Sequence, residues 1–387
     1  MVYISRFAEK QLEHSLKSGK IVIVLGSRQV GKTTMVERFV AGKKAVFLNL
    51  DVELNKQKLE SLSKIDPKDA FRNLGNPDII IIDEAQRLAS AASIVKGWYD
   101  SKMPCKFILL GSSSLSLAKN ASESLAGRNI KITLAPLSFR EIVKNQSWYS
   151  EDYSWDFIQN NFKEQIKNLL LETIVFGSFP EVISTAEKRV YLTNLVSDYL
   201  LQDILHMGLV KNPDIIKKLL ALLAFQVASE VSVNELANRL AISRVTVERY
   251  LDLLEQTYVI FRLKSFSHNP RREISKNSKI YFWDTGVRNA ILNEFNVSEL
   301  RSDIGQLWEN WVIAEFAKYN AHSFFERNLY FWRTRGGSEV DLVVKDSKGI
   351  LAYEVKWSDK SKPVGGAFYS AYKTIPKIIN SKNPLLV

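Results

Sequence analysis

Residues 21–34 read IVIVLGSRQVGKTT, and this stretch decides the fold. The five apolar residues 21–25 predict a buried strand, and residues 34–40 predict the helix that follows it. Between the two, residues 26–33 match the pattern G-x-x-x-x-G-K-[ST], in which a glycine-rich loop joins a strand to a helix and surrounds a phosphate. The sequence therefore predicts a phosphate-binding loop at the end of this strand.

The residue types of the loop fit nucleotide binding. Gly26 and Gly31 allow the backbone to turn its N–H groups toward a phosphate, which also meets the positive end of the helix. Lys32 is expected to reach the terminal phosphates and Thr33 to bind Mg²⁺, with help from Thr34. A glycine turn without a ligand is the alternative. We expect ATP and Mg²⁺ as cofactors, with ATP held by Gly26, Ser27, Arg28, Gln29, Val30, Gly31, Lys32, Thr33 and Thr34.

Two further strand ends carry polar residues. Residues 78–86, DIIIIDEAQ, end a strand with two adjacent acids, so we assign Asp83 to the magnesium shell and Glu84 to the attacking water. Solvated turn acids are the alternative. A strand at 106–111 leads into serines, where a hydroxyl of Ser112 or Ser113 can sense the γ-phosphate, although serines alone indicate only a loop.

The spacing of apolar runs divides the chain into regions. Up to about residue 140, short apolar runs alternate with amphipathic stretches, which predicts a parallel sheet covered by helices. Long amphipathic segments at 155–174 and 190–205 predict a helical subdomain, residues 219–265 predict shorter helices, and residues 278–387 predict strands mixed with helices. The predicted strands of the first region are 21–25, 45–50, 78–83, 106–111 and 130–134.

Composition narrows the class of protein. The 387 residues are 46% hydrophobic and 25% charged, enough for several globular domains. The 53 basic and 42 acidic residues give a net charge of +11, which favours a polyanionic partner, with nucleic acid ahead of an anionic membrane surface. A single cysteine, Cys105, excludes an internal disulfide framework and a four-cysteine metal site. No run of about 18 apolar residues occurs, so we expect a cytoplasmic protein without membrane contact.

Residues 232–256 predict a helix-turn-helix. A capping box starts a short helix at Ser232, a tight turn follows, and residues 244–256 form a second helix with polar side chains outside. Residues 262–279 then contain six basic residues and one acid, as expected for contact with phosphate backbones. A structural module for protein contacts is the alternative. The expected DNA contacts are Arg244, Thr246, Arg249, Arg271 and Arg272.

The C-terminal region has the residues for a second metal site. Glu354 and Lys356 are two residues apart on one predicted strand and so share a face, and Asp341 lies on the neighbouring strand. Asp341 and Glu354 would share a hard cation, Glu309 would complete the site from a helix, and Lys356 would stabilise phosphate charge. Glu315 is an alternative helix carboxylate. An exposed hairpin with charge pairs between its strands is the alternative to a metal site.

The chain resembles a family of bacterial and archaeal AAA-type ATPases in the runs LGSRQVGKTT (25–34), IIIIDEAQ (79–86), LLGSSSLSLAKNASESLAGR (109–128) and LAPLSFRE (134–141). Members of this family carry a C-terminal winged-helix and nuclease-like region. The resemblance covers nearly the whole chain, and it implies that Ser112 or Ser113 is the first sensor. It also implies that Arg128 is an arginine finger for a neighbouring subunit, where the alternative is an ordinary surface arginine. A finger supplied in trans implies a homo-oligomer, such as a ring.

The C-terminal order of Glu309, Asp341, Glu354 and Lys356 resembles the PD-(D/E)xK nuclease fold, with Glu339-Val340-Asp341 in place of the Pro-Asp pair. Together these features predict an α/β protein in which a P-loop core of the AAA+ type is joined to a helical lid, a winged helix-turn-helix and a mixed α/β nuclease-like domain. The expected boundaries are 1–150, 151–215, 216–285 and 286–387.

The function expected is that of an oligomeric DNA-binding ATPase. ATP hydrolysis would drive gripping, translocation on or remodelling of duplex or branched DNA without preference for base sequence. One rival is a metal-dependent DNA nuclease regulated by ATP. The other rival is a nucleotide-dependent protein switch that binds no DNA.

Overall fold

A computed structural model describes residues 3–112, 125–200, 212–267, 278–324, 327–334, 336–358 and 366–386. The chain divides into two compact units, which we describe separately. The N-terminal unit consists of Ser5–Ala135 with Gln256–Tyr258, and the C-terminal unit consists of Pro136–Glu255 and Val259–Val387 with Met1–Ile4. Among the described residues, none of the helices is long and apolar enough to cross a membrane.

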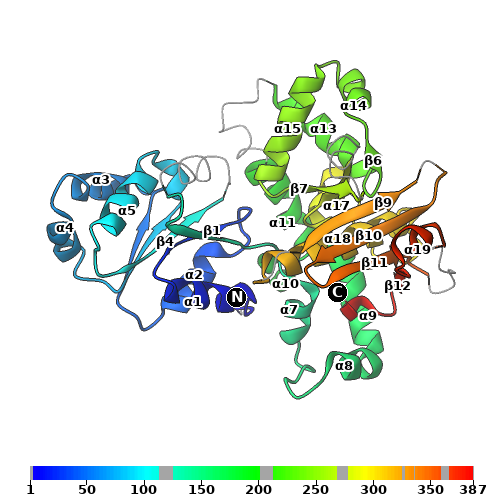
Figure 1. Ribbon diagram of the computed structural model, residues 1–387, viewed down its shortest axis with the longest axis horizontal. Helices are drawn as coiled ribbons and strands as arrows, with labels where there is room; N and C mark the ends of the chain where they lie inside the picture. Colours follow the sequence, from blue (N-terminus) through cyan, green and yellow to red (C-terminus); the bar gives the residue numbers. More distant parts are fainter. Residues whose placement is uncertain are drawn as a thin grey trace. The chain divides into compact units, whose positions relative to one another are not determined.

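The N-terminal unit is built on a five-stranded parallel sheet in the order β2-β3-β4-β1-β5. Its neighbouring strands β4 and β1 are labelled in Figure 1. Each strand matches its predicted position to within one residue, so the prediction of a parallel α/β core is confirmed. All five side chains of both β1 and β3 are buried, because both faces of a parallel sheet are covered. The strands are β1 (Ile21–Leu25), β2 (Ala45–Asn49), β3 (Ile79–Asp83), β4 (Lys106–Gly111) and β5 (Asn129–Thr133).

The helices of this unit follow from short local signals. The N–H of Lys68 donates to the Asp66 carboxylate, and Pro67 occupies the first turn, which together start α4. Buried apolar side chains of α3, α4 and α5 pack with those of the strands in one core. The helices are α1 (Ala8–Lys17), α2 (Lys32–Val40), α3 (Glu53–Leu62), α4 (Pro67–Asn73), the short 3₁₀ helix η1 (Ala85–Arg87) and α5 (Ala91–Asp100).

The C-terminal unit begins with helices. The amphipathic segment 155–174, which reads as one helix, is divided at Phe162, whose ring stacks on Trp148 with centroids 4.9 Å apart. The predicted second segment, 190–205, is described only in part. The first helices are α7 (Phe139–Lys144), α8 (Trp155–Asn161), α9 (Lys163–Phe176), α10 (Pro180–Ser184), α11 (Lys188–Asn194) and the π-helix η2 (Leu195–Leu200).

A mixed sheet follows, in the order β12-β11-β10-β9-β7-β8-β6. Strand β7 pairs antiparallel with β8 and parallel with β9, so the sheet connects segments assigned by sequence to two different domains. The four-domain division remains a prediction. The strands are β6 (Glu230–Val231), β7 (Ile260–Ser265), β8 (Ser278–Phe282), β9 (Asn328–Arg333), β10 (Glu339–Asp346), β11 (Gly349–Val355) and β12 (Lys377–Ile379).

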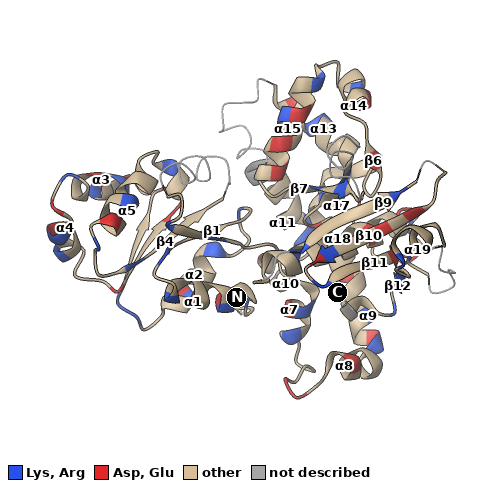
Figure 2. Ribbon diagram, in the orientation of Figure 1, with Lys and Arg blue, Asp and Glu red and all other residues tan. Residues whose placement is uncertain are grey.

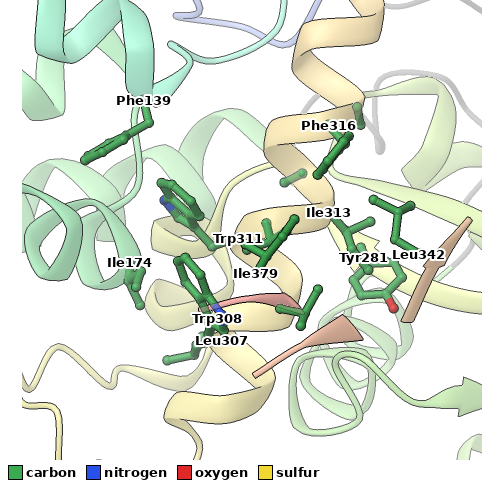
Figure 3. Packing of buried hydrophobic residues seen from close by; sticks show 14 of the residues in the cluster. Phe139, Ile174, Tyr281, Leu307, Trp308, Trp311, Ile313, Phe316, Leu342 and Ile379 are labelled. Carbon is green, nitrogen blue, oxygen red and sulfur yellow. The ribbon is translucent and has the colours of Figure 1, made fainter. Parts of the chain in front are cut away.

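Helix α18 lies at the centre of the core of this unit. Its side chains Trp308 and Trp311 stack with centroids 5.2 Å apart, and Phe139 meets Trp311 edge to face (Figure 3). Tyr281 and Leu342 contribute to the same cluster from the sheet. The remaining helices are α13 (Pro213–Phe225), α14 (Val233–Leu240), α15 (Arg244–Gln256), α17 (Thr285–Leu292), α18 (Ile304–Ala321), α19 (Gly366–Tyr372) and the 3₁₀ helix η3 (Pro384–Leu386).

A buried polar network links α18 to the loops before α7 and α10. The ammonium of Lys318 donates to the Leu137 carbonyl at 3.1 Å, to Ser178 Oγ at 2.9 Å and to Glu315 at 2.8 Å. The other oxygen of Glu315 accepts from the Phe139 N–H at 2.7 Å. Burial raises the pKa of Glu315, and its attraction to Lys318 opposes this rise. Buried ions need such partners, so this network specifies how α18 packs.

Two glycines allow α9 and α17 to approach closely. A Cβ atom on Gly177, whose φ is +73°, would lie 1.9 Å from the carboxylate of Asp284. A Cβ atom on Gly286 would lie 2.1 Å from the carbonyl oxygen of Phe176. The Asp284 carboxylate uses this proximity to accept from the Ser178 N–H at 2.7 Å.

Gly286→Ala should therefore destabilise the protein. The clash is with a backbone carbonyl, which cannot rotate away as a flexible side chain would. We expect the free energy of unfolding to fall by about 1–3 kcal/mol in chemical denaturation. The matched control is Gly305→Ala, also in a helix, where no atom lies within 4 Å of the added Cβ. The control should be neutral or stabilising by up to about 1 kcal/mol. Equal stability of the two variants would contradict the packing.

Candidate functional site

The predicted nucleotide residues meet at the carboxyl ends of neighbouring strands in the parallel sheet. Strand β4 lies between β3 and β1, and all three strands run in the same direction. Their carboxyl ends are followed by Gly26, Glu84 and Ser112 respectively for β1, β3 and β4. Ligands of open α/β sheets bind outside these carboxyl ends. The sheet order thus brings together three motifs that are 28 to 86 residues apart in the chain.

The loop after β1 has the conformation that its glycines permit. Gly31 has φ +93° and is followed by the first turn of α2. A Cβ atom on Gly26 would lie 2.2 Å from the carbonyl oxygen of Leu134, so only glycine fits there. The ammonium of Lys32 is buried and donates to the loop carbonyls of Gly26 at 3.0 Å and Ser27 at 2.8 Å. The lysine is thereby held over the loop.

Thr33 and Asp83 are in direct contact. The Thr33 hydroxyl donates to one carboxylate oxygen of Asp83 at 2.7 Å, and the other oxygen accepts from the Glu84 N–H at 2.8 Å. Asp83 is buried, whereas Thr34, the predicted assistant, is exposed. The hydroxyl and carboxylate predicted to share Mg²⁺ therefore lie side by side, and both are the oxygen ligands that this ion prefers.

Glu84 is oriented by a residue to which the sequence analysis gave no role. The side-chain amide of Gln86 donates to the Glu84 carboxylate and, at 3.0 Å, to Ser112 Oγ. Burial raises the pKa of Glu84, attraction to Lys32 lowers it, and repulsion from Asp83 raises it further. The signal that was overlooked is the position of Gln86, two residues after Glu84 in the motif DEAQ.

Arg6 is a second functional candidate that the sequence analysis missed. Its guanidinium is buried and donates to the Val30 carbonyl at 2.9 Å and to the Ala135 carbonyl at 2.5 Å. The Arg6 side chain thus connects the Val30 carbonyl of the phosphate loop to the Ala135 carbonyl, two residues after β5. Nothing in its sequence neighbourhood marks it, because the contact depends on the tertiary fold.

Arg128 lies at the opposite end of the same sheet, beside the amino ends of β1 and β5. Its carbonyl accepts from the N–H of Ile21, the first residue of β1, and its side chain bonds to Asp100 at 2.7 Å. The length of β1, roughly 16 Å, separates this end from the loop. Arg128 therefore lies away from the loop that is predicted to bind the nucleotide.

The second helix of the predicted helix-turn-helix is α15. Ser243 Oγ accepts from the Thr246 N–H at 3.1 Å and caps the first turn. Arg244 and Arg249 are exposed, Thr246 is half-buried, and Val247 and its apolar partners are buried as predicted. Arg271 and Arg272, the other expected DNA contacts, lie outside the described residues, and so does Ser113, the second candidate for the γ-phosphate sensor.

Not all of the basic residues between 262 and 279 are available to bind a phosphate backbone. Both signs of charge alternate along α15 (Figure 2). Arg262 of β7 is bound by three acids of this helix, at 3.2 Å by Glu248 and 3.0 Å by Glu255, and also by Asp252. Lys279 of β8 is buried in ion pairs. Two of the six basic residues counted between 262 and 279 are therefore engaged inside the fold.

The predicted C-terminal residues come together in part. Leu342 of β10 pairs with Tyr353 of β11, so Asp341 and Glu354 are the next residues on the two strands, and both are buried. Asp341 accepts from the Val355 N–H at 2.7 Å and lies 3.3 Å from the Lys356 ammonium. Glu315, the alternative helix carboxylate, forms an ion pair with Lys318.

Glu309 is held by other partners. It accepts from Lys279 Nζ at 2.9 Å and from the Tyr281 hydroxyl at 2.7 Å. Burial raises the pKa of Glu309 to about 7, although Lys279 opposes this. Within the part of the chain that the structure describes, no three His, Cys, Asp or Glu side chains form a group that could hold a metal ion. The metal site with Glu309, Asp341 and Glu354 therefore stays a prediction, and in the structure the Glu309 carboxylate faces the Lys279 ammonium and the Tyr281 hydroxyl.

Arg6→Met should weaken ATP binding, because it removes the buried donor that joins the Val30 carbonyl of the loop to the Ala135 carbonyl. We expect the dissociation constant for a fluorescent ATP analogue to rise about tenfold or more. Arg38→Met, on the exposed side of α2, is the matched control and should bind like the wild type. Equal binding by both variants would remove Arg6 from the site.

Comparison with known proteins agrees with the site geometry. Residues 18–143 match the family model of an AAA domain, and residues 167–298 and 304–383 match two domains of unknown function, DUF8612 and DUF4143. An uncharacterized protein of Mycobacterium tuberculosis is 27% identical over 362 residues, which cover 92% of this chain and 74% of that protein. An uncharacterized protein of Methanocaldococcus jannaschii is 26% identical over 378 residues, 93% of this chain and 80% of that protein.

Among solved structures, a Walker-type ATPase of Pyrococcus abyssi has a similar fold, with a TM-score of 0.50 and 17% identity over 75% of this chain and 96% of that chain. The AAA family match covers the loop, the acidic strand end and the strand before Ser112. The motifs, the sheet order and this match together identify the N-terminal unit as a P-loop ATPase core.

Proposed function

We propose that this protein binds and hydrolyses ATP at the loop after β1 and uses the turnover to act on DNA through its C-terminal unit. The observation that supports the first part is the 2.7 Å contact between the Thr33 hydroxyl and the Asp83 carboxylate. It joins two sequence motifs 50 residues apart at the position where a P-loop ATPase binds its metal ion.

The donor set fits Mg²⁺. Thr33 Oγ1 and a carboxylate oxygen of Asp83 would hold the ion, and bound Mg²⁺ would neutralise charge on the transferred phosphoryl group. Gln86 Oε1 and Ser27 Oγ are buried without a hydrogen-bond partner among the described residues. Buried polar groups normally have partners, so these two atoms favour a polar ligand at this edge.

The residues of the chain support hydrolysis by positioning. Lys32 would pair with the terminal phosphates once it exchanges its loop carbonyls for phosphate oxygens. A water oxygen would bond to the γ-phosphorus while the bond from that phosphorus to the bridging oxygen breaks, giving ADP and phosphate. Glu84, held by Gln86, would accept the proton of that water, and Ser112 would contact the γ-phosphate through its hydroxyl.

Arg128 would act in a neighbouring subunit. Its place at the amino end of β5, away from its own loop, and its partial exposure support a role in trans. Such a role requires a homo-oligomer and requires Arg128 to leave Asp100.

Lys32→Ala should abolish ATP turnover, because the ammonium that meets the terminal phosphates is lost. Glu84→Gln should retain ATP binding but lower the rate of hydrolysis by about a hundredfold or more, since it keeps the Gln86 contact and removes the base. Phosphate release and nucleotide retention on a filter measure the two effects. Normal hydrolysis by Lys32→Ala would refute the assignment of the loop.

The DNA part of the proposal rests on the first turns of α15. Arg244, Val245 and Arg249 are exposed there, and Val245 retains 79% of its surface. The N-terminal residues of a recognition helix are those that meet DNA, and exposed arginines attract phosphates. The ATPase and helix pair in one chain favour a coupled activity over the protein-switch rival.

Duplex DNA should stimulate ATP hydrolysis, and the stimulation should weaken as salt rises from about 50 to 200 mM. The double variant Arg244→Ala, Arg249→Ala should lose this stimulation and retain basal turnover. The charge-matched control Lys163→Ala, Lys167→Ala removes two exposed lysines from α9 and should respond like the wild type. Turnover that depends on Lys32 but is indifferent to DNA would favour the protein switch.

A further inference from the structure

We propose that the ammonium of Lys279 serves as a built-in cation in the C-terminal unit, so that the carboxylates resembling a nuclease centre form an ion-pair clamp and bind no divalent metal. This inference goes beyond the proposed function, because it concerns a cluster that neither ATP hydrolysis nor DNA contact by α15 uses.

The clamp is centred on one buried side chain. Lys279 Nζ lies 2.9 Å from Glu309 of α18 and 2.5 Å from Glu339 of β10, and only 4% of the lysine side chain is exposed. Its ring-face contact with Phe331 of β9 has the ammonium 5.7 Å from the ring centroid. Burial lowers the pKa of Lys279, but Glu309 and Glu339 outweigh burial and raise it to about 12. The ammonium is thus a permanent positive charge at this position.

Tyr281 completes the clamp from the same strand. It is two residues after Lys279 on β8, so both side chains project from one face of the strand. Its hydroxyl donates to the Glu309 oxygen that Lys279 also contacts. Tyr281 is packed in the core near Ile313 and Leu342, as Figure 3 shows. Glu309 therefore has two donors that are fixed by packing.

Asp341 is also occupied. Its Oδ2 accepts from the Val355 N–H at 2.7 Å and from Lys356 at 3.3 Å. A metal would have to replace a backbone donor at this oxygen and two donors at Glu309. A divalent cation must lose water to bind, and the charge of Glu309 is already compensated by the buried Lys279 ammonium.

The clamp joins elements that are distant in sequence. Lys279 belongs to the strand pair after α15, Glu309 to the central helix α18 and Glu339 to β10. Breaking one partner of a buried ion pair leaves an uncompensated charge, so the lysine stabilises the packing of these three elements. The Lys279 ammonium thereby holds carboxylates of different elements together, as a bound metal ion does in a structural metal site.

The test measures Mn²⁺ binding to the full-length protein without nucleotide, from the electron paramagnetic resonance signal of free Mn²⁺. Wild type should show no C-terminal site. Lys279→Met should gain an Mn²⁺ site, with an apparent dissociation constant at least tenfold below any Mn²⁺ binding of the wild type. Adding Asp341→Asn should remove that gain. Lys264→Met, at an exposed lysine of β7, is the matched control and should behave like the wild type.

Thermal unfolding gives a second readout. Lys279→Met should lower the melting temperature by roughly 5 to 10 °C, and adding Glu309→Gln should restore at least half of this loss because it removes the unpaired carboxylate. If the single variant does not fold, the double variant still should. Failure of both to fold, or a Lys279→Met protein as stable as Lys264→Met, would overturn the clamp.

Wild-type metal binding would also overturn it. The decisive results are a sub-millimolar Mn²⁺ site that Asp341→Asn abolishes, absence of any gain in Lys279→Met, or Mn²⁺-dependent nicking of plasmid DNA that Lys356→Ala abolishes. None of these measurements involves ATP or α15. Failure here is therefore distinguishable from failure of the proposed ATPase or DNA activity.

Discussion

The nucleotide site depends on where strand β1 ends. Hydrogen bonds to β4 and β5 hold both edges of β1, and its last residue, Leu25, accepts from the Leu134 N–H at 2.7 Å. The next residue, Gly26, lies so close to the Leu134 carbonyl that no side chain fits. Because the strand cannot shift and the loop cannot start elsewhere, the first turn of α2 places Lys32 and Thr33 beside the end of β3. The chemistry of the site is thus a consequence of sheet pairing.

In the C-terminal unit, the packing of the helices depends on buried polar contacts. Asp284 bonds to the backbone beside Gly177, and Lys318 joins Leu137, Ser178 and Glu315 inside the core. Such groups are costly to bury, and each is compensated only when all partners are in place. The network therefore selects one arrangement of α18 against the loops before α7 and α10, which apolar packing alone would specify less strictly.

The sequence predicts the N-terminal unit far better than the C-terminal one, for a physical reason. A strand buried on both faces is a continuous apolar run, and a phosphate loop has fixed glycine positions, so both are visible locally. The contact of Arg6 with Val30 and the pairing of Lys279 with Glu309 depend on tertiary folding and have no local signal. The break at Phe162 also has no local signal, since helical periodicity continues through this residue, while in the structure its backbone is not helical and its ring stacks on Trp148.

Charge at a position and charge available to a ligand are different quantities, and this distinction separates the two candidate sites. Lys32 donates to two carbonyls of its own loop, and phosphate oxygens can replace these neutral acceptors without leaving a carboxylate unpaired. Lys279 and Arg262 are each bound by carboxylates, so recruiting either to a phosphate would strand those acids. Formal charge summed along a sequence cannot tell these cases apart. The same residue types therefore form a ligand site where their partners are replaceable, and a structural clamp where they are not.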